Sequence, residues 1–195
     1  MAEEIAPARG SARRARTDAR IATAVHEQLR HGGYASLTIE GVAAASGVAK
    51  TTIYRRWASK AEMVYSVVIH TDEGSSAIDT GTLAGDVRRL AERAVALVAE
   101  EPGRSVLPGL LADMTGDAEL AGRLRESFIA AARGEIVAML DRARLRGELT
   151  ETVPVAEFHA ALLGIPYAHV HLLADAETDR LVGSLSRQLL ALLHP

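Results

Sequence analysis

The chain contains no cysteine, so disulfides, thiolate metal sites and cysteine nucleophiles are all excluded. This composition suits a reducing compartment, and we expect a cytoplasmic protein. Aromatic residues make up only 4% of the 195 residues. Ala and Leu dominate the apolar fraction of 48%, and both are strong helix formers. The composition therefore predicts an all-α fold.

Long uninterrupted apolar runs are also lacking. The most apolar long stretch, residues 155–174, contains Glu157, Pro166 and three histidines. A membrane-spanning helix needs about 20 predominantly apolar residues, so this stretch predicts a buried helix instead. Residues 1–20 contain no apolar segment of the kind that a secretory signal requires. We expect no association with a membrane.

Charge is distributed unevenly along the chain. Residues 1–70 contain 10 Lys and Arg against 6 Asp and Glu, a net charge of +4. The remainder carries −7, which gives the overall net charge of −3. A basic N-terminal third on an acidic body indicates a polyanionic partner for that third alone.

The first residues predict a basic arm followed by a helix. Residues 1–16 are rich in Ala and Arg and are expected to be disordered, either as a solvated tail or as an arm that touches DNA. From Thr17 a helical period begins, with Ile21, Val25 and Leu29 spaced four apart. The paired glycines of HGGY (residues 31–34) end it.

Three short helices are expected next. Thr38 stands where the N-cap of the first belongs, and Gly47 can adopt the left-handed backbone that a tight turn needs. The next helix spans residues 50–57. Ser59 and Glu62 form a capping box that opens another helix, which reaches about residue 70.

A short helix, a turn through Gly47 and a second short helix make a helix-turn-helix. On residues 50–57, Ala49, Ile53 and Trp57 share one face and are expected to pack inward. The opposite face offers hydrogen-bond donors and cations, as a helix that enters the major groove requires. The side chains of that face and its flanks are Lys50, Thr51, Thr52, Tyr54 and Arg55. Thr38 and Lys60 lie in first helical turns, which favour phosphate binding.

The second half continues as helices. A polar segment over residues 71–81 predicts a loop or linker, and helical periods resume at Leu83. One long helix is expected over residues 117–146, a helix bent near Pro166 follows, and the last helix carries a leucine row. That row comprises Leu181, Leu185, Leu189 and Leu192, with Gly183, Ser184 and Ser186 beside it. About nine helices are expected in total.

Residues for catalysis, cofactors or metals do not stand out. The sequence contains no recognisable carboxylate pair, nucleophile–base pair, phosphate-binding loop or metal-ligand spacing. His169 and His171 project about 200° apart on a helix, which does not suit a shared metal ion. We therefore expect no catalytic residues, no cofactor and no metal, and a protein that is not an enzyme.

The segment LTIEGVAAASGVAKTTIYRRWASKAEMV (residues 37–64) resembles the signature of TetR-family transcriptional regulators. The resemblance covers about residues 17–70. It implies phosphate contacts by Thr52, Tyr54 and Lys60 and variable base contacts by Arg55, Lys50 and Thr51, with Arg56 counted among the DNA-binding residues. An Arg in such a helix most often reads guanine. Two positions depart from the family pattern, because Ala49 replaces a capping residue and Trp57 replaces Phe.

The same resemblance implies that residues 71–195 form a ligand pocket and a homodimer interface. The last two helices, residues 154–174 and 177–193, would form a four-helix bundle across a two-fold axis. The effector is expected to be a small apolar or amphipathic molecule. The candidate pocket residues are Met63, Val67, His70, Leu107, Leu111, Met114, Phe128, Met139 and Tyr167. For each apolar one taken singly, a place in the plain hydrophobic core is the favoured interpretation. His159, His169 and His171 are further candidates for polar anchors.

The sequence thus predicts an arm (residues 1–16), a helix-turn-helix domain (17–70) and a C-terminal helical domain (71–195). The predicted function is that of a dimeric repressor released from a pseudo-palindromic operator by a ligand. An activator, or a regulator without a ligand, is equally compatible with the sequence. A helical enzyme or a protein-interaction module that binds an acidic partner is a more remote alternative.

Overall fold

The computed structural model describes residues 6–69, 78–150, 154–175 and 177–193, with backbone alone for residues 6–11. All regular secondary structure in these ranges is helical, without any strand, which confirms the predicted all-α class. No helix among them combines the length and the apolar character needed to cross a bilayer. The chain separates into an N-terminal unit, Met1–Thr71 with Ser105–Gly116, and a C-terminal unit, Asp72–Arg104 with Asp117–Pro195. The sequence did not reveal that residues 105–116 belong with the N-terminal unit.

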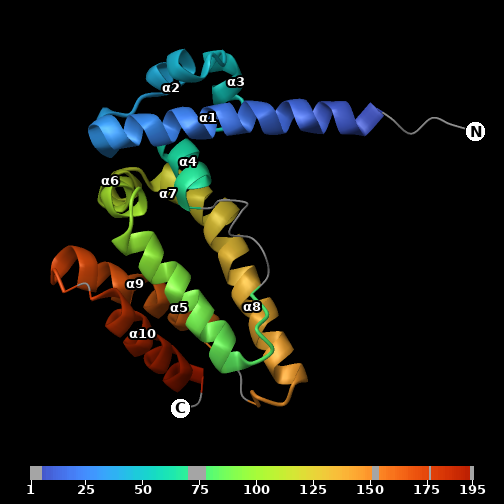
Figure 1. Cartoon of the computed structure of the whole chain (residues 1–195), viewed down its shortest axis with the longest axis vertical. Coiled ribbons are helices and arrows are strands. Elements are labelled where there is room, and N and C mark those ends of the chain that lie inside the picture. Colours follow the sequence, from blue (N-terminus) through green and yellow to red (C-terminus); the bar gives the residue numbers. More distant parts are fainter. Residues whose placement is uncertain (1–5, 70–77, 151–153, 176, 194–195) are drawn as a thin grey trace, which may run out of the picture. The chain divides into compact units, whose positions relative to one another are not determined.

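The N-terminal unit begins with a long helix (Figure 1). Helix α1 is assigned to Ala6–Ser36, but Gly33 has a non-helical backbone with φ of 67°. The paired glycines therefore interrupt the helix, as the sequence predicted. The start differs from the prediction, because residues 6–16 of the expected disordered arm are helical and continuous with the residues after Thr17.

Shorter helices follow α1 in the same unit. They are α2 (Ile39–Ser46), α3 (Lys50–Tyr54) and α4 (Lys60–Val64), which continues into the π-helical turn η1 (Tyr65–Ile69). Helix α3 is three residues shorter than predicted, and Trp57 lies in the turn after it. Helix α2 packs against α1 and α3.

Apolar side chains at helical spacing hold these helices together. Ile21, Val25 and Leu29 of α1 are buried, and so are Val42 of α2 and Ile53 of α3. Full burial of one such side chain contributes roughly 1.5–3 kcal/mol, which offsets the poor intrinsic stability of five-residue helices. This small core therefore fixes the position of α3 on the helices that precede it.

The helix ends follow the predicted capping signals. The backbone N–H of Gly41 donates to the Thr38 hydroxyl (3.0 Å), and the N–H of Glu62 donates to the Ser59 hydroxyl (3.1 Å). Gly47 has φ of 62°, in the left-handed region that the turn between α2 and α3 requires. Ala49 precedes α3 with an extended backbone and provides no side-chain cap. The first N–H groups of α3 therefore lack the partner that Ser would supply.

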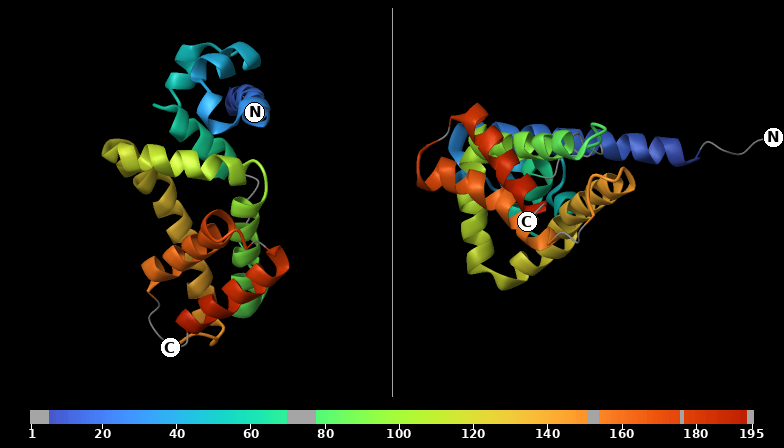
Figure 2. Two further views of the ribbon diagram at one scale, coloured as in Figure 1. Left: turned by 90° about the vertical axis from the view of Figure 1, so that its left-hand side faces the viewer. Right: turned by 90° about the horizontal axis from the view of Figure 1, so that it is seen from below.

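The C-terminal unit is a helical bundle. It contains α5 (Leu83–Ala99), α7 (Ala118–Leu124), α8 (Ala130–Leu145), α9 (Val155–Tyr167) and α10 (Thr178–Leu193). Helix α6 (Gly103–Gly116) begins in this unit and passes into the N-terminal one. Helix α10 packs on α5 and α9, and α9 also packs on α5 and α8 (Figures 1 and 2).

Two expectations for this unit need correction. The predicted single helix over residues 117–146 is divided into α7 and α8 by a π-helical turn, η3 (Arg125–Ile129). In α10 the buried leucine row ends with Leu193, whereas Leu192 is 38% exposed.

Helix α9 runs through Pro166 and continues into the π-helical turn η4 (Ala168–Leu172). This turn follows the proline that removes a backbone donor.

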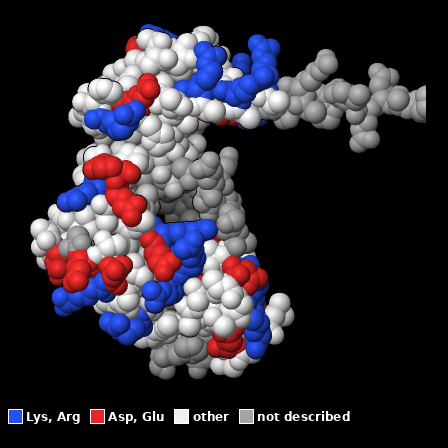
Figure 3. Space-filling view, viewed as in Figure 1, with Lys and Arg blue, Asp and Glu red and all other residues white. Residues whose placement is uncertain are grey.

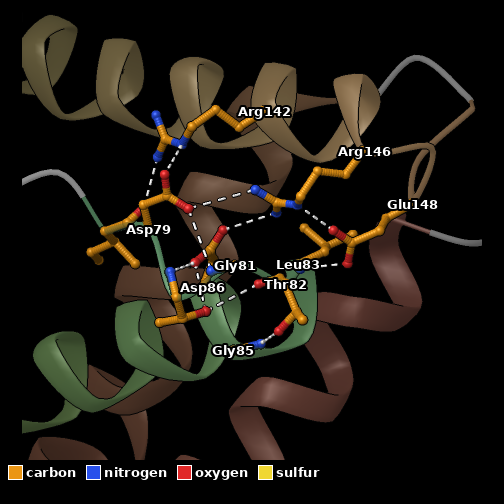
Figure 4. A network of polar contacts seen from close by, with 11 residues as sticks. Asp79, Gly81, Thr82, Leu83, Gly85, Asp86, Arg142, Arg146 and Glu148 are labelled. Carbon is orange, nitrogen blue, oxygen red and sulfur yellow. Dashed lines mark hydrogen bonds and ion pairs between the residues drawn. The ribbon is translucent and has the colours of Figure 1, made fainter.

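A buried carboxylate organises the start of α5 (Figure 4). Asp86 is fully buried and accepts hydrogen bonds from the backbone N–H (2.7 Å) and hydroxyl (2.8 Å) of Thr80. Arg146 pairs with Asp86 at 3.2 Å and also with Glu148, which accepts the Leu83 N–H at 2.7 Å. The network connects the end of α8 with the N-terminus of α5.

Candidate nucleic-acid interface

Helix α3 presents a polar surface to solvent. Lys50, Thr51 and Arg55 are exposed, Tyr54 is 48% exposed, and Thr52 is half-buried. All of these side chains can donate hydrogen bonds. The helix therefore brings together the donor-rich face that the sequence predicted, on a scaffold anchored by its opposite side.

The anchoring side differs in one residue from the prediction. Ile53 is completely buried and Trp57 is half-buried, but Ala49 is exposed. Because Ala49 lies outside the helix with ψ of 137°, the 100° spacing that predicted its inward direction does not apply to it. Ile53 is therefore the main anchor, and its carbonyl accepts the backbone N–H groups of Arg56 and Trp57, at 2.9 and 3.0 Å, in the turn that ends α3.

Lys50 is paired with a residue of the preceding helix. Its Nζ lies 3.1 Å from a carboxylate oxygen of Glu40, and both side chains are more than half exposed. The Glu40 backbone N–H, and after it Lys50, holds the pKa of Glu40 below its usual value. An exposed pair of this kind contributes little to stability, so Lys50 can exchange Glu40 for a phosphate or a base at small cost.

The two adjacent arginines have different environments. Arg55 is exposed, whereas the side chain of Arg56 is 15% exposed and forms an ion pair with Asp18 of α1. Burial, and after it the nearby charge of Arg14, lowers the pKa of Arg56. Arg55 thus remains available to a ligand, while Arg56 ties the end of α3 to α1.

Lys60 has two contacts with Tyr34. Its ammonium donates to the Tyr34 carbonyl at 3.2 Å and lies 4.2 Å from the centre of the Tyr34 ring. The cation–π contact and the hydrogen bond orient Lys60, which retains two further N–H donors. Thr38, the other residue in a first helical turn, is exposed.

Tyr34 also connects to α6. Its hydroxyl donates to Oδ2 of Asp113 at 2.5 Å, and the Tyr34 side chain is buried. Burial, and after it the hydrogen bond to Asp113, raises the pKa of Tyr34. Gly109 of α6 lies against the same ring, since a Cβ there would be 2.4 Å from Cδ1 of Tyr34. Tyr34 therefore joins α4 and α6 within the N-terminal unit.

Arg20 fixes the turn of the helix-turn-helix from α1. Its Nη2 donates to the Ser46 carbonyl at 2.5 Å, which satisfies one of the last carbonyls of α2. The left-handed Gly47 follows directly. Arg20 thus holds the turn before α3, and Asp18 holds Arg56 just after it.

The candidate pocket residues fall into both units. Met63, Val67, Leu107, Leu111 and Met114 belong to the N-terminal unit, and Phe128, Met139 and Tyr167 belong to the C-terminal one. Met63 and Met139 are almost completely buried, as core residues are, and Leu111 is 39% exposed. The Tyr167 ring lies 4.5 Å from that of His171. His70 lies outside the described residues.

Sequence reasoning missed several residues that position the interface. Asp18, Arg20, Tyr34 and Asp113 are separated from their partners by between 26 and 79 positions, and no local pattern marks them. In the sequence, Asp18 and Arg20 could be recognised only as polar residues beside the apolar row of α1. Their roles depend on long-range packing.

Known proteins resemble the chain over both units. Residues 77–192 match the family described as "Tetracyclin repressor-like, C-terminal domain", and residues 21–67 match "Bacterial regulatory proteins, tetR family". An uncharacterized HTH-type transcriptional regulator of Mycobacterium tuberculosis, Rv1556, is 34% identical over 63% of this chain. The matched region spans only 60% of the length of that relative.

Two further similarities cover nearly the whole chain. The DNA-binding transcriptional repressor TetR of Mycobacteroides abscessus is 32% identical over 96% of this chain and 97% of its own length. The crystal structure of the TetR family transcription regulator SCO0332 has a TM-score of 0.74 and 30% identity, covering 92% of this chain and 99% of that one. With matches over both units and along most of its length, the chain belongs to the TetR family of bacterial transcriptional regulators.

Proposed function

We propose that the protein is a sequence-specific DNA-binding repressor that binds a pseudo-palindromic operator as a homodimer and is released by a small-molecule effector. The observation that carries the proposal is the exposed donor face of α3, held by a buried Ile53 and by contacts to α1. The repressor of Mycobacteroides abscessus, similar over almost its full length, supports the direction of regulation.

Within this proposal, Arg55 reads a base, because its guanidinium is exposed and matches the two acceptors of guanine. Thr51 and Lys50 flank it and contact neighbouring base edges. Thr52, Tyr54 and Lys60 bind phosphates, with Thr38 beside them at the start of α2. Arg56 acts indirectly, since its pairing with Asp18 orients the end of α3.

Dimerisation would use α9 and α10, the last two helices. Leu163 is 42% exposed, Leu172 73%, Leu173 64% and Leu192 38%, so large apolar side chains of this region reach solvent in the single chain. Several large exposed apolar side chains in one region of a chain are typical of an interface. A two-fold dimer presents two copies of α3, which would read half-sites about one helical turn apart.

The effector would act through α6. This helix begins in the C-terminal unit, and its residues 105–116 belong to the N-terminal unit. There Asp113 holds Tyr34, and Tyr34 holds Lys60 of α4. An effector that favours one arrangement of α6 would shift the position of α4, by no more than its difference in affinity for the two states.

Selection from a random duplex pool tests the proposal. Wild-type protein is expected to enrich a two-fold symmetric sequence and to sediment as a dimer. Arg55→Ala should weaken binding by about 1–3 kcal/mol and relax one base position, while Lys60→Ala should weaken all sequences alike. Arg125→Ala, an exposed arginine of the C-terminal unit, serves as the control and should bind normally.

Two results would contradict the proposal. One is the absence of any enriched sequence together with a monomeric chain. The other is a changed sequence preference in Lys60→Ala with none in Arg55→Ala, which would reverse the assigned roles. For the effector, a thermal-shift screen followed by release of the selected operator supplies the test, and activation of a reporter by the protein would exclude repression.

A further inference from the structure

The N-terminal half of α1 carries a cluster of arginines that the helix-turn-helix assignment does not use. Arg13, Arg14 and Arg16 are exposed, and they form no ion pair with any residue whose side chain the structure describes. Figure 3 shows Lys and Arg side chains gathered over α3 and the adjacent part of α1. The chain as a whole is acidic, so this cluster of unpaired cations indicates a local anionic partner.

Two rows of side chains place these arginines beside α3. Arg13, Arg16 and Arg20 are spaced three and four apart and so lie on one side of α1. Arg20 at the end of this row donates to the Ser46 carbonyl in the turn that precedes α3. The Arg20 end of this row therefore lies at the turn that precedes α3.

The second row reaches the other end of α3. Arg14 and Asp18 are four residues apart, and Asp18 pairs with Arg56, just after α3. Burial, and after it the charge of Arg14, lowers the pKa of Arg56. One carboxylate thus accompanies two cations, and the group of three has a net positive charge.

The helical conformation sets the reach of the cluster. Arg13 precedes Arg16 by three residues, which is about 4.5 Å along an α-helix. Each DNA strand places one phosphate per about 3.4 Å of the duplex axis, so arginines spread over this length can reach about two of them. A disordered arm would lose conformational entropy on binding, whereas residues of a continuous helix are already ordered.

We propose that Arg13, Arg14 and Arg16 form an arginine ridge that binds about two DNA backbone phosphates outside the base pairs read by α3. The ridge is continuous with the base-reading face and complementary in charge to the DNA backbone. It adds affinity without sequence information, because phosphate contacts carry none. Asp18 limits that affinity by neutralising part of the charge of Arg14 and Arg56. The inference depends on the proposed DNA-binding function.

The test uses the full chain and the duplex enriched by wild type, with and without flanking base pairs. In Arg13→Gln/Arg14→Gln/Arg16→Gln the helix propensity is retained and the charge is lost. Two phosphates per protomer are four per dimer, so the slope of log affinity against log salt should become less steep by about 3.6. Between 50 and 200 mM salt, this corresponds to about a 150-fold smaller loss of affinity.

Flank length and a second variant provide independent measurements. Wild type should bind the flanked duplex more tightly than the trimmed one, and the triple variant should bind both alike. Asp18→Asn removes the intervening carboxylate and should bind more tightly with a steeper salt slope. Arg88→Gln/Arg125→Gln/Arg133→Gln, exposed arginines of the C-terminal unit, is the matched control and should retain the wild-type slope. Circular dichroism and melting confirm that each variant is folded.

The outcomes separate this inference from the proposed function. If wild type selects a sequence but the triple variant keeps its slope and its dependence on the flanks, the ridge does not bind phosphates and only this inference fails. A change in the preferred flanking bases would also overturn it, in favour of base reading. If wild type selects no sequence, the proposed function fails, and the inference about the arginine ridge, which depends on it, fails as well.

Discussion

Removal of the Tyr34 hydroxyl is the perturbation that best tests the internal linkage of the N-terminal unit. The hydroxyl donates to Asp113 at 2.5 Å, and its residue is buried at 6% exposure. Tyr34→Phe retains the ring and its contact with Lys60 but leaves Asp113 without this donor. A hydrogen bond to a charged group contributes about 1.5–3 kcal/mol, and the solvent access of Asp113 favours the lower end.

We therefore expect Tyr34→Phe to destabilise the N-terminal unit by about 1.5 kcal/mol. The assay is urea denaturation followed by fluorescence of Trp57, the single tryptophan, which lies in the same unit. Tyr54→Phe is the matched control, since Tyr54 is 48% exposed and should lose little or nothing. In a double-mutant cycle with Asp113→Ala, the two losses should be non-additive by about 1 kcal/mol or more.

Alkaline pH supplies a second measure of the same bond. Because the pKa of Tyr34 is raised in the folded state, the unfolded chain loses this proton first as the pH passes about 10. The contribution of Tyr34 is thus complete below pH 10 and declines above it, by at most 1.36 kcal/mol per pH unit. The difference between wild type and Tyr34→Phe should shrink from pH 9 to 11. A difference that stays constant over this range, with additive losses in the cycle, would refute the reasoning.

Three further predictions concern the rest of the fold. Asp86→Ala should destabilise the C-terminal unit by about 3 kcal/mol, because it leaves Arg146 without its buried partner; a loss below 1 kcal/mol by circular dichroism in urea would contradict this. Ala49→Ser should stabilise the N-terminal unit by about 1 kcal/mol by capping α3, measured by Trp57 fluorescence, and no gain would mean that the uncapped N–H groups are already satisfied. Arg146, and after it the Leu83 N–H, lowers the pKa of Glu148, so its contribution should be present above about pH 4 and lost below it. Glu148→Gln should accordingly flatten the acid side of the stability profile in pH-dependent melts.

The packing of α1 positions two basic residues around the proposed DNA-binding face. Lys60, which is proposed to bind a phosphate, and Arg56, which orients the end of α3, are each held by a carbonyl or side chain of α1. Their positions therefore depend on how α1 packs, and Tyr34 connects that packing to α6. Within the N-terminal unit, Tyr34 thus connects α6 with Lys60 in the first turn of α4.

Sequence alone determined the helical class, the helix-turn-helix and most helix ends, because these depend on local chemistry. The Thr38 and Ser59 caps, the left-handed Gly47 and the interruption at Gly33 all follow from the residue itself and its nearest neighbours. The donor-rich face of α3 likewise follows from helical spacing around Ile53.

Tertiary structure decided which of those polar residues stay free. Arg55 and Arg56 are adjacent in sequence and identical in chemistry, yet one is exposed and the other is paired with a carboxylate 38 positions away. The membership of residues 105–116 in the N-terminal unit, and the burial of Asp86 beside Arg146, also depend on segments far apart in the chain. Helical periodicity predicts the direction of a side chain relative to its own helix, but only packing determines which group it meets there.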